Sequence, residues 1–354
     1  MKIKIGKKII SKKNKTYFVA DIAANHDGSL SRAKKLIKLC AKAGANAAKF
    51  QHFRAETIVS NYGFEKIGKL SHQKKWKKSV FQVYKEASIN NKWTKILKTE
   101  CKKNKIDFLT SPYDLEYVDF VYKYVDAYKI GSGDISWLDI IKKIAKKKKP
   151  VLIATGASTL NEVKKSVKLI KRYNKKIILM QCNTNYTASV ENIEYLNLNV
   201  LRTYEKIFKN NVILGLSDHT FGHNSVLGAV ALGARVIEKH FTDNNKRYGP
   251  DHKFSLNPIT WKKMVLETRQ LEKSLGDGIK KIEKNEVESS IVQRRSIRAS
   301  RKLFKGEKIE NKMLTYLRPF SKESLNPYEK NKIIGRKLLK NVHKGDVVNW
   351  KKIK

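Results

Sequence analysis

Short apolar runs alternate with longer segments of helical periodicity along most of the chain. Eight runs predict strands, at Tyr17–Ala23, Ala47–Gln51, Asp107–Thr110, Ala127–Gly131, Val151–Thr155, Ile177–Cys182, Val212–Leu216 and Val236–Phe241. They are rich in β-branched and apolar residues, as is typical of parallel strands buried on both faces. Because helical segments lie between them, the order favours a parallel sheet, and eight such units predict a closed TIM (β/α)8 barrel.

Helix boundaries are also marked in the sequence. Ser29 is a suitable N-cap for a helix that Gly44 would end, and Thr159 with Glu162 forms a capping box after the fifth strand. The stretch Phe53–Asn91 is too long for an ordinary strand–helix loop. We therefore expect an insertion over the mouth of the barrel.

The pattern changes after about Lys281. The segments Ser296–Leu314 and Gly335–Ile353 share a Lys-Gly-acid turn followed by alternating apolar residues. This weak internal repeat predicts a small β-rich domain made of two related halves. We expect a barrel domain at residues 1–280, and a linker with a C-terminal domain at residues 281–354.

The chain is strongly basic, with 76 Lys and Arg against 32 Asp and Glu and a formal net charge of +44. Such a charge raises the possibility of nucleic-acid binding. The basic residues are mostly lysines, however, and they are spread through the whole chain. We therefore expect a solvated basic surface with no nucleic-acid partner, whose positive field would steer small anionic substrates.

Features of secreted or membrane proteins are absent from the sequence. The segment Met1–Ser11 is charged throughout, and no apolar run approaches the ~20 residues of a membrane span. The three cysteines have no metal-binding or redox spacing, which favours reduced thiols. These observations predict a cytoplasmic protein that does not associate with membranes.

Polar residues stand at the carboxyl end of every predicted strand, where the active site of a TIM barrel lies. One polar strand end is more often solvated than functional, but eight that converge on one rim indicate a site. The candidates from the strand ends are Asp21, Lys49, Gln51, Lys129, Ser132, Asp134, Thr155, Thr184, Tyr186, Ser217, His219 and His240.

Two of these candidates, Lys49 and Lys129, lie inside apolar strands and are expected to point towards the barrel axis. A buried lysine is costly unless it meets an anion. The two could therefore bind a phosphate and a carboxylate, or could pair with Asp21 or Asp134. Neighbouring hydroxyl and amide groups could complete an anion site, namely Gln51, Ser132, Thr155 and Thr184.

Two histidines, His219 and His240, end adjacent predicted strands and have acidic neighbours, Asp218 and Glu238. Imidazoles with carboxylates nearby are suitable ligands for a divalent metal. Two protein ligands would leave coordination positions open for substrate and water.

These motifs together resemble the sialic acid synthase family, which includes N-acetylneuraminate synthase and its legionaminate and pseudaminate relatives. The similar segments are, in order, ADIAANHDGS, KFQ, SPYD, YKIGSGD, ATGAS, QCNTNY, GLSDHT, IEKHFT and GPDHKFS. The tail from Arg295 resembles the antifreeze-like (SAF) domain of that family. The resemblance covers nearly all of residues 16–354.

The resemblance implies a metal-dependent condensation of phosphoenolpyruvate with an open-chain N-acetylmannosamine-type sugar, in a domain-swapped homodimer. It assigns Mn²⁺ or Mg²⁺ to His219 and His240 and catalytic roles to Asp21 and Asp134. Phosphoenolpyruvate would meet Lys49, Gln51, Lys129, Ser132 and Ser217, with Thr155 and Thr184 as further candidates. The sugar would meet Tyr186, Asp251 and, from the partner subunit, Arg318.

The sequence departs from the family pattern at several of these positions. Asp21 and Asp134 stand where many members have glutamate, so each carboxylate reaches less far. Ala154 replaces a serine that holds phosphate in some members, and Thr184 aligns with an asparagine.

Three alternatives remain open from the sequence. The acceptor could be a 2,4-diacetamido-6-deoxy hexose, giving a legionaminate- or pseudaminate-type acid. Related barrel enzymes join phosphoenolpyruvate to phosphorylated aldoses, and the antifreeze-like tail argues against that class. The chain could also be a basic, non-catalytic binding protein on a degenerate barrel, which the intact set of rim residues argues against.

Overall fold

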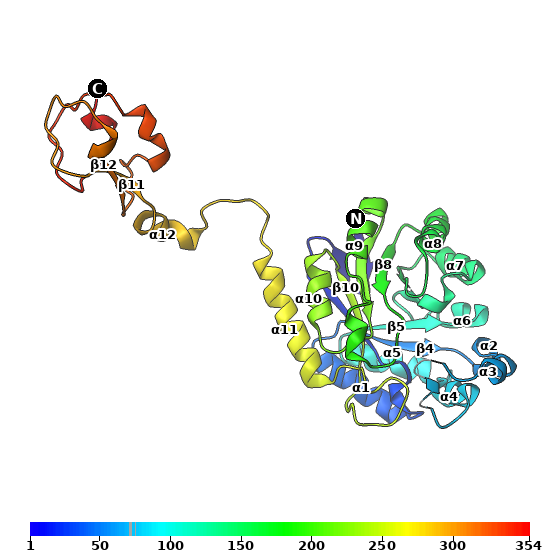
Figure 1. Ribbon diagram of the computed structural model, residues 1–354. Coiled ribbons are helices and arrows are strands. Elements are labelled where there is room, and N and C mark those ends of the chain that lie inside the picture. The colour runs from blue at the N-terminus through cyan, green and yellow to red at the C-terminus, as the bar shows by residue number, and fades with distance from the viewer. Residues whose placement is uncertain (71–72, 75) are drawn as a thin grey trace. The chain divides into compact units, whose positions relative to one another are not determined.

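The chain folds into two compact units, Met1–Gly276 and Asp277–Lys354. The computed structural model describes residues 1–70, 73–74 and 76–354. The first unit is a closed barrel of parallel strands with helices outside, and the second is a small β-rich domain (Figure 1). The fold class predicted from the sequence is therefore confirmed.

Eight parallel strands close the barrel in sequence order, with the last strand hydrogen-bonded to the first. They are β3 (Tyr17–Asp21), β4 (Ala47–His52), β5 (Asp107–Pro112), β6 (Tyr128–Ile130), β7 (Val151–Ala154), β8 (Ile177–Cys182), β9 (Ile213–Asp218) and β10 (Val236–His240). All eight predicted strands are confirmed, with ends that shift by no more than two residues. Because every strand runs in the same direction, all eight carboxyl ends meet at one rim.

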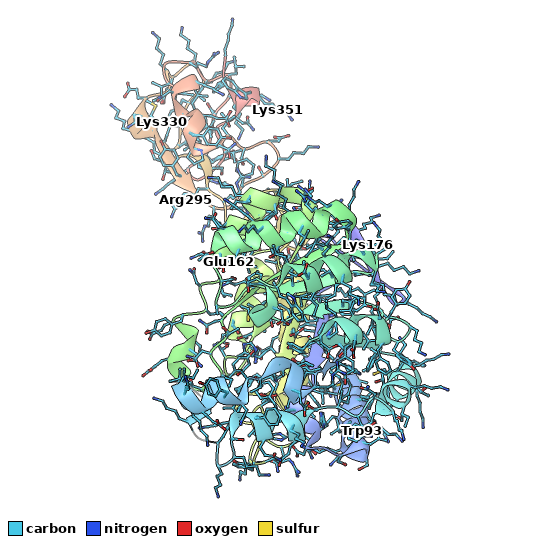
Figure 2. All side chains as sticks on the ribbon, turned by 90° about the vertical axis from the view of Figure 1, so that its right-hand side faces the viewer. Trp93, Glu162, Lys176, Arg295, Lys330 and Lys351 are labelled. Carbon is cyan, nitrogen blue, oxygen red and sulfur yellow. The ribbon has the colours of Figure 1, made fainter. Side chains whose placement is uncertain are left out.

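A helix follows each barrel strand and packs on the outside (Figure 1). These helices are α1 (Leu30–Lys42), α5 (Trp93–Lys103), α6 (Leu115–Phe120), α7 (Leu138–Lys146), α8 (Leu160–Tyr173), α9 (Val200–Phe208), α10 (Asn224–Ala231) and α11 (Pro258–Ser274). The Ser29 hydroxyl accepts a hydrogen bond from the Arg32 N–H at the start of α1, as predicted. The predicted capping box of Thr159 and Glu162 opens α8, where Figure 2 labels Glu162.

An insertion separates β4 from α5, as the length of the segment predicted. It contains the short helices α2 (Ala55–Ile58), α3 (Asn61–Ile67) and α4 (Val80–Ala87). Phe53, Ile58 and Tyr84 of this insertion line a cavity together with the barrel residues Gln51 and His240. The insertion therefore covers part of the carboxyl-end rim.

An N-terminal hairpin, β1 (Lys2–Ile5) and β2 (Lys8–Ser11), was not predicted from the sequence. Its side chains Ile3, Ile5 and Ile10 are buried and join the cluster that fills the barrel interior. That cluster includes Tyr17, Val236 and other residues from around the barrel, many of them at the amino ends of the strands. The hairpin therefore closes the end of the barrel opposite the rim.

The C-terminal unit is built from two related halves. It contains α12 (Val287–Val292) and the antiparallel strands β11 (Ser296–Ala299) and β12 (Leu314–Leu317) around its own apolar core. Leu303 and Val342 occupy equivalent positions in the two halves, and each backbone N–H donates to the other's carbonyl. This reciprocal pairing is what a two-fold relation between the halves requires, so the predicted repeat is confirmed.

Basic side chains lie on the outside of both units, for example Lys176 and Lys351, which Figure 2 labels. This distribution matches the expectation that the positive charge is spread rather than gathered in one segment. Among the residues that the structure describes, no helix has the length and apolar character needed to cross a membrane.

Candidate active site

A small polar chamber of about 30 Å³ lies at the carboxyl ends of the barrel strands. Its lining comprises Asp21, Lys49, Gln51, Ser111, Tyr113, Lys129, Gly131, Ser132, Ala154, Cys182, Tyr186, Ser217, His219, Glu238 and His240. Nine of the residues singled out as candidates from the sequence are in this set. Their convergence follows from the parallel direction of the strands.

The floor of the chamber holds two lysines and two carboxylates, all at most 5% exposed. The Lys49 ammonium lies 2.6 Å from Asp21 and 3.5 Å from Glu238. The Lys129 ammonium lies 2.5 Å from the same oxygen of Glu238. Lys49 thus has the Asp21 partner considered as an alternative, whereas Lys129 pairs with Glu238 and not with Asp134.

Glu238 was considered in the sequence only as a neighbour of the histidines, and its place between the lysines was missed. Burial raises its pKa, but the charges of Lys129 and Lys49 outweigh burial and lower that pKa to about 2. The Oε2 atom of Glu238 is buried without a hydrogen-bond partner. The available signal was the alternation along β10, which puts Glu238 and His240 on the same face.

The two histidines lie side by side, with ring centroids 5.3 Å apart. Burial lowers the pKa of His219 to about 3 and that of His240 to about 4, so both rings are neutral near pH 7. The Nδ1 atom of His219 lies 2.8 Å from the Asn183 carbonyl oxygen, an arrangement that puts the proton on Nδ1 and a lone pair on Nε2. His240 has a buried Nδ1 atom without a hydrogen-bond partner. Two neutral imidazoles with available lone pairs fit a divalent cation.

Aromatic rings pack against these imidazoles. The Tyr186 ring centroid is 4.2 Å from that of His219, and the Phe254 centroid is 5.0 Å from that of His240. Among the described residues, no group of three or more His, Cys, Asp or Glu side chains is arranged to hold a metal ion. A cation at this pair would therefore need substrate or water oxygens to complete its coordination.

Asp218, which the sequence suggested as an acidic neighbour of the histidines, does not line the chamber. Side chains alternate along a strand, so Ser217 and Glu238 face the axis while Asp218 and Lys239 face the surrounding helices. The Asp218 carboxylate lies 2.6 Å from the Lys239 ammonium instead. Its carboxylate is therefore engaged outside the chamber.

A second cavity of about 170 Å³ adjoins the chamber. Its lining comprises Ala24, Gln51, Phe53, Ile58, Trp76, Val83, Tyr84, Ala87, Tyr113, Tyr186, His240, Pro250 and Asp251. Four of these residues, Gln51, Tyr113, Tyr186 and His240, also line the chamber. The two spaces therefore share a wall, with a charged inner part and a largely apolar and aromatic outer part.

Two threonines considered for phosphate binding are placed differently. The Thr155 hydroxyl donates to the Met180 carbonyl oxygen and accepts from the Tyr204 hydroxyl, so it is engaged in the barrel wall. Thr184 lies beside Gly156, where an added Cβ would come within 2.6 Å of its methyl carbon. Neither threonine is in the lining of the chamber.

The remaining candidates lie at the margins of the site or beyond it. Burial raises the pKa of Asp134 to about 6. Burial also raises the pKa values of Tyr84 and Tyr113, and the charge of Asp134 raises them further. Asp251 lines the outer cavity, and its Oδ2 atom is 3.7 Å from His240 Nδ1. Arg318 is an exposed residue of the C-terminal unit, directly after β12.

The sequence and the fold are both similar to those of known proteins. Residues 36–280 match the NeuB family, and residues 294–354 match the SAF domain. The chain is 37% identical to N,N'-diacetyllegionaminic acid synthase of Campylobacter jejuni, over 94% of this chain and 99% of that protein. It is 32% identical to the pseudaminic acid synthase of the same species, over 94% of this chain and 95% of that protein.

A solved structure agrees with these sequence matches. The sialic acid synthetase of Leptospira borgpetersenii superposes with a TM-score of 0.71 at 29% identity, covering 82% of this chain and 95% of that chain. The resemblance drawn from the rim motifs is therefore confirmed. With its eight-stranded barrel, its rim of lysines and histidines and its antifreeze-like tail, the chain belongs to the NeuB family.

Proposed function

We propose that this chain condenses phosphoenolpyruvate with the aldehyde of an open-chain N-acyl amino sugar and water, giving a nonulosonic acid and phosphate. A bond forms between C3 of phosphoenolpyruvate and the aldehyde carbon. Water adds at C2, and the C2–O bond to phosphate then breaks. The relatives are named as synthases of legionaminic, pseudaminic and sialic acids, and these names support this reaction class.

The observation that carries the proposal is the pair of buried lysines in the chamber. Lys49 and Lys129 are both 3% exposed and share Glu238. A ligand with both a phosphate and a carboxylate can take over these contacts, because each ammonium has three donors and accepts an anion as a point charge. Gln51, Ser132 and Ser217 lie in the same wall and can donate further hydrogen bonds.

The histidine pair suits Mn²⁺ or Mg²⁺, which would supply a positive charge to polarise the aldehyde oxygen. The protein's part is to keep both imidazoles neutral, and burial does so for His219 and His240. The ring of Tyr186 packs against that of His219, with 4.2 Å between the ring centroids.

Two carboxylates are candidates for proton transfer. The pKa of Asp134 is raised by burial to about 6, so this group can take up or release a proton near neutral pH. Asp21 accepts a hydrogen bond from the Ala23 N–H and contacts Lys49, which holds its carboxylate in the floor of the chamber.

The sugar is assigned to the outer cavity, next to Tyr186 and Asp251. Arg318 of a partner subunit would complete that cavity in a domain-swapped homodimer. The working enzyme would then be dimeric, and we assign it to the cytoplasm as part of the same proposal.

One observation favours a second acceptor over N-acetylmannosamine. The described lining of the outer cavity has no Lys or Arg, and Phe53, Ile58, Val83 and Ala87 give it an apolar side. Such a wall suits methyl groups, as in a 2,4-diacetamido-6-deoxy hexose, and offers no cation for a sugar phosphate. A legionaminate-type product is therefore the second candidate.

A phosphate-release assay tests both candidates. The purified protein would be incubated with phosphoenolpyruvate, Mn²⁺ and a panel of acceptors: N-acetylmannosamine, its 6-phosphate, and 2,4-diacetamido-6-deoxy hexoses. We expect release with unphosphorylated acceptors and a product whose mass equals acceptor plus phosphoenolpyruvate plus water minus phosphate. Absence of acceptor-dependent release across the panel would contradict the proposed function.

A further inference from the structure

A buried ion pair occupies the last rung of the ladder between β9 and β10, on the face turned away from the chamber. Lys239 pairs with Asp218 in the strand register, and their side chains are 1% and 0% exposed. The Lys239 ammonium donates to Asp218 Oδ2 at 2.6 Å and to the Thr220 carbonyl oxygen at 2.7 Å. It therefore contacts the residues on both sides of His219.

The Asp218 carboxylate also forms hydrogen bonds within the turn that contains His219. Its Oδ1 atom accepts from the backbone N–H and the hydroxyl of Thr220, both at 2.8 Å. Its Oδ2 atom accepts from the Ser225 hydroxyl at the start of α10. The chain on either side of His219 is thus closed into a hydrogen-bonded turn after β9 ends.

We infer that the Lys239–Asp218 pair is a positioning device that sets the distance and orientation between His219 and His240. Lys239 directly precedes His240 on β10, and Asp218 directly precedes His219 at the end of β9. The pair therefore joins the two chain segments that carry the imidazoles, immediately before the imidazoles. This inference rests on the proposed metal-binding role of the two histidines.

Stability alone is a poor explanation for this pair. Two charges withdrawn from water lose solvation that their attraction recovers only in part, and apolar replacements of buried pairs are often neutral or stabilising. What an apolar pair cannot supply is the directed set of hydrogen bonds to Thr220 and Ser225. Ligand orientation by outer hydrogen bonds typically changes metal affinity by about 10–100-fold.

The test measures Mn²⁺ binding directly, by electron paramagnetic resonance of free Mn²⁺, together with kcat and KM. Lys239→Met removes the ammonium, and Asp218→Asn/Lys239→Met removes both charges so that no unpaired charge stays buried. We expect both variants to bind Mn²⁺ about 10–100-fold more weakly, with a matching fall in kcat. Ser225→Ala removes one donor and should weaken binding by only a few-fold.

Lys98→Met is a control away from the histidines, at an ion pair whose side chains are 31% and 27% exposed. It removes an ion pair with Asp126, 2.5 Å long, from the opposite end of the barrel. It should lower stability without changing Mn²⁺ affinity. If the double variant Asp218→Asn/Lys239→Met is folded and binds Mn²⁺ as tightly as the wild type, the inference is overturned while the proposed function still stands. Failure of the wild type to bind Mn²⁺ would overturn the inference and the metal role together, and phosphate release still tests the reaction class.

Discussion

Replacing Glu238 by glutamine should make the barrel less stable and, at the same time, more responsive to phosphate. The Glu238 carboxylate lies 2.5 Å from the Lys129 ammonium and 3.5 Å from the Lys49 ammonium, so it neutralises the charge of Lys129 and part of the charge of Lys49. Lys49 keeps Asp21 in the variant, but Lys129 loses its anionic partner in a buried place. The chamber then carries one uncompensated positive charge that a bound anion can neutralise.

The magnitude follows from the geometry. At an effective dielectric constant of about 20, the gross attractions are roughly 7 kcal/mol at 2.5 Å and roughly 5 kcal/mol at 3.5 Å. Desolvation offsets much of this, and removing one partner of a buried pair typically costs about 3–5 kcal/mol. Because glutamine still accepts a hydrogen bond from Lys129, we expect a loss of about 3 kcal/mol in the free energy of unfolding.

Urea unfolding followed by tryptophan fluorescence would measure this loss, since four of the five tryptophans lie in the barrel unit. Phosphate at 100 times its dissociation constant should raise the free energy of unfolding of the variant by about 2.7 kcal/mol. The wild type should gain less, because phosphate must first displace the Glu238 carboxylate. Asp126→Asn, which removes the partner of Lys98 away from the chamber, should lose stability without a larger response to phosphate.

Two results would refute this reasoning. One is a variant as stable as the wild type without phosphate, which would mean that Glu238 does not compensate Lys129. The other is equal stabilisation of both proteins by phosphate, which would mean that the anion binds elsewhere.

Four further outcomes are expected. His219→Ala or His240→Ala should abolish turnover and weaken Mn²⁺ binding, and full activity with metal chelated would contradict the metal role. Arg318→Ala should raise KM for the sugar about tenfold or more while leaving KM for phosphoenolpyruvate within a few-fold, as expected for a charged contact to one substrate; equal effects would remove Arg318 from the sugar site. Asp134→Asn should abolish a kinetic inflection near pH 6, since burial raises the Asp134 pKa to about 6. Burial lowers the pKa of His52 from 6.5 to about 3, so the unfolded chain binds the extra proton first, and stability should fall as pH drops from 6.5 towards 3. His219 and His240 contribute to the same slope, so His52→Gln should make it shallower without abolishing it in urea titrations at several pH values.

The positions of the strands could be predicted because buried parallel strands leave continuous apolar runs, and the rim could be predicted because every strand ends there. The sequence could not show which carboxylates form ion pairs with the buried lysines. The sequence suggested Asp21 or Asp134 as partners of the buried lysines, and the barrel geometry instead places Glu238 against Lys129. Thr155 was considered because of its place at a strand end. Alternation turns Ala154 towards the chamber and Thr155 into the wall.

The hairpin was missed for a different reason. Lysines and isoleucines alternate along β1, and β2 has an exposed isoleucine, Ile9, beside the buried Ile10, so the pattern is as typical of a surface strand as of a core strand. Only the open end of the barrel gives the buried isoleucines their place. The proposed contact of Arg318 with the sugar would likewise need a second subunit, about which one chain's sequence pattern carries no direct signal.

The hairpin also has a consequence for the folding kinetics. Ile3, Ile5 and Ile10 contact a cluster drawn from the first to the last barrel strand, so their binding surface does not exist until β10 has joined β3. The first residues of the chain are therefore among the last to reach their native contacts. In a refolding experiment, amide protection at β1 and β2 should report closure of the barrel rather than the start of collapse.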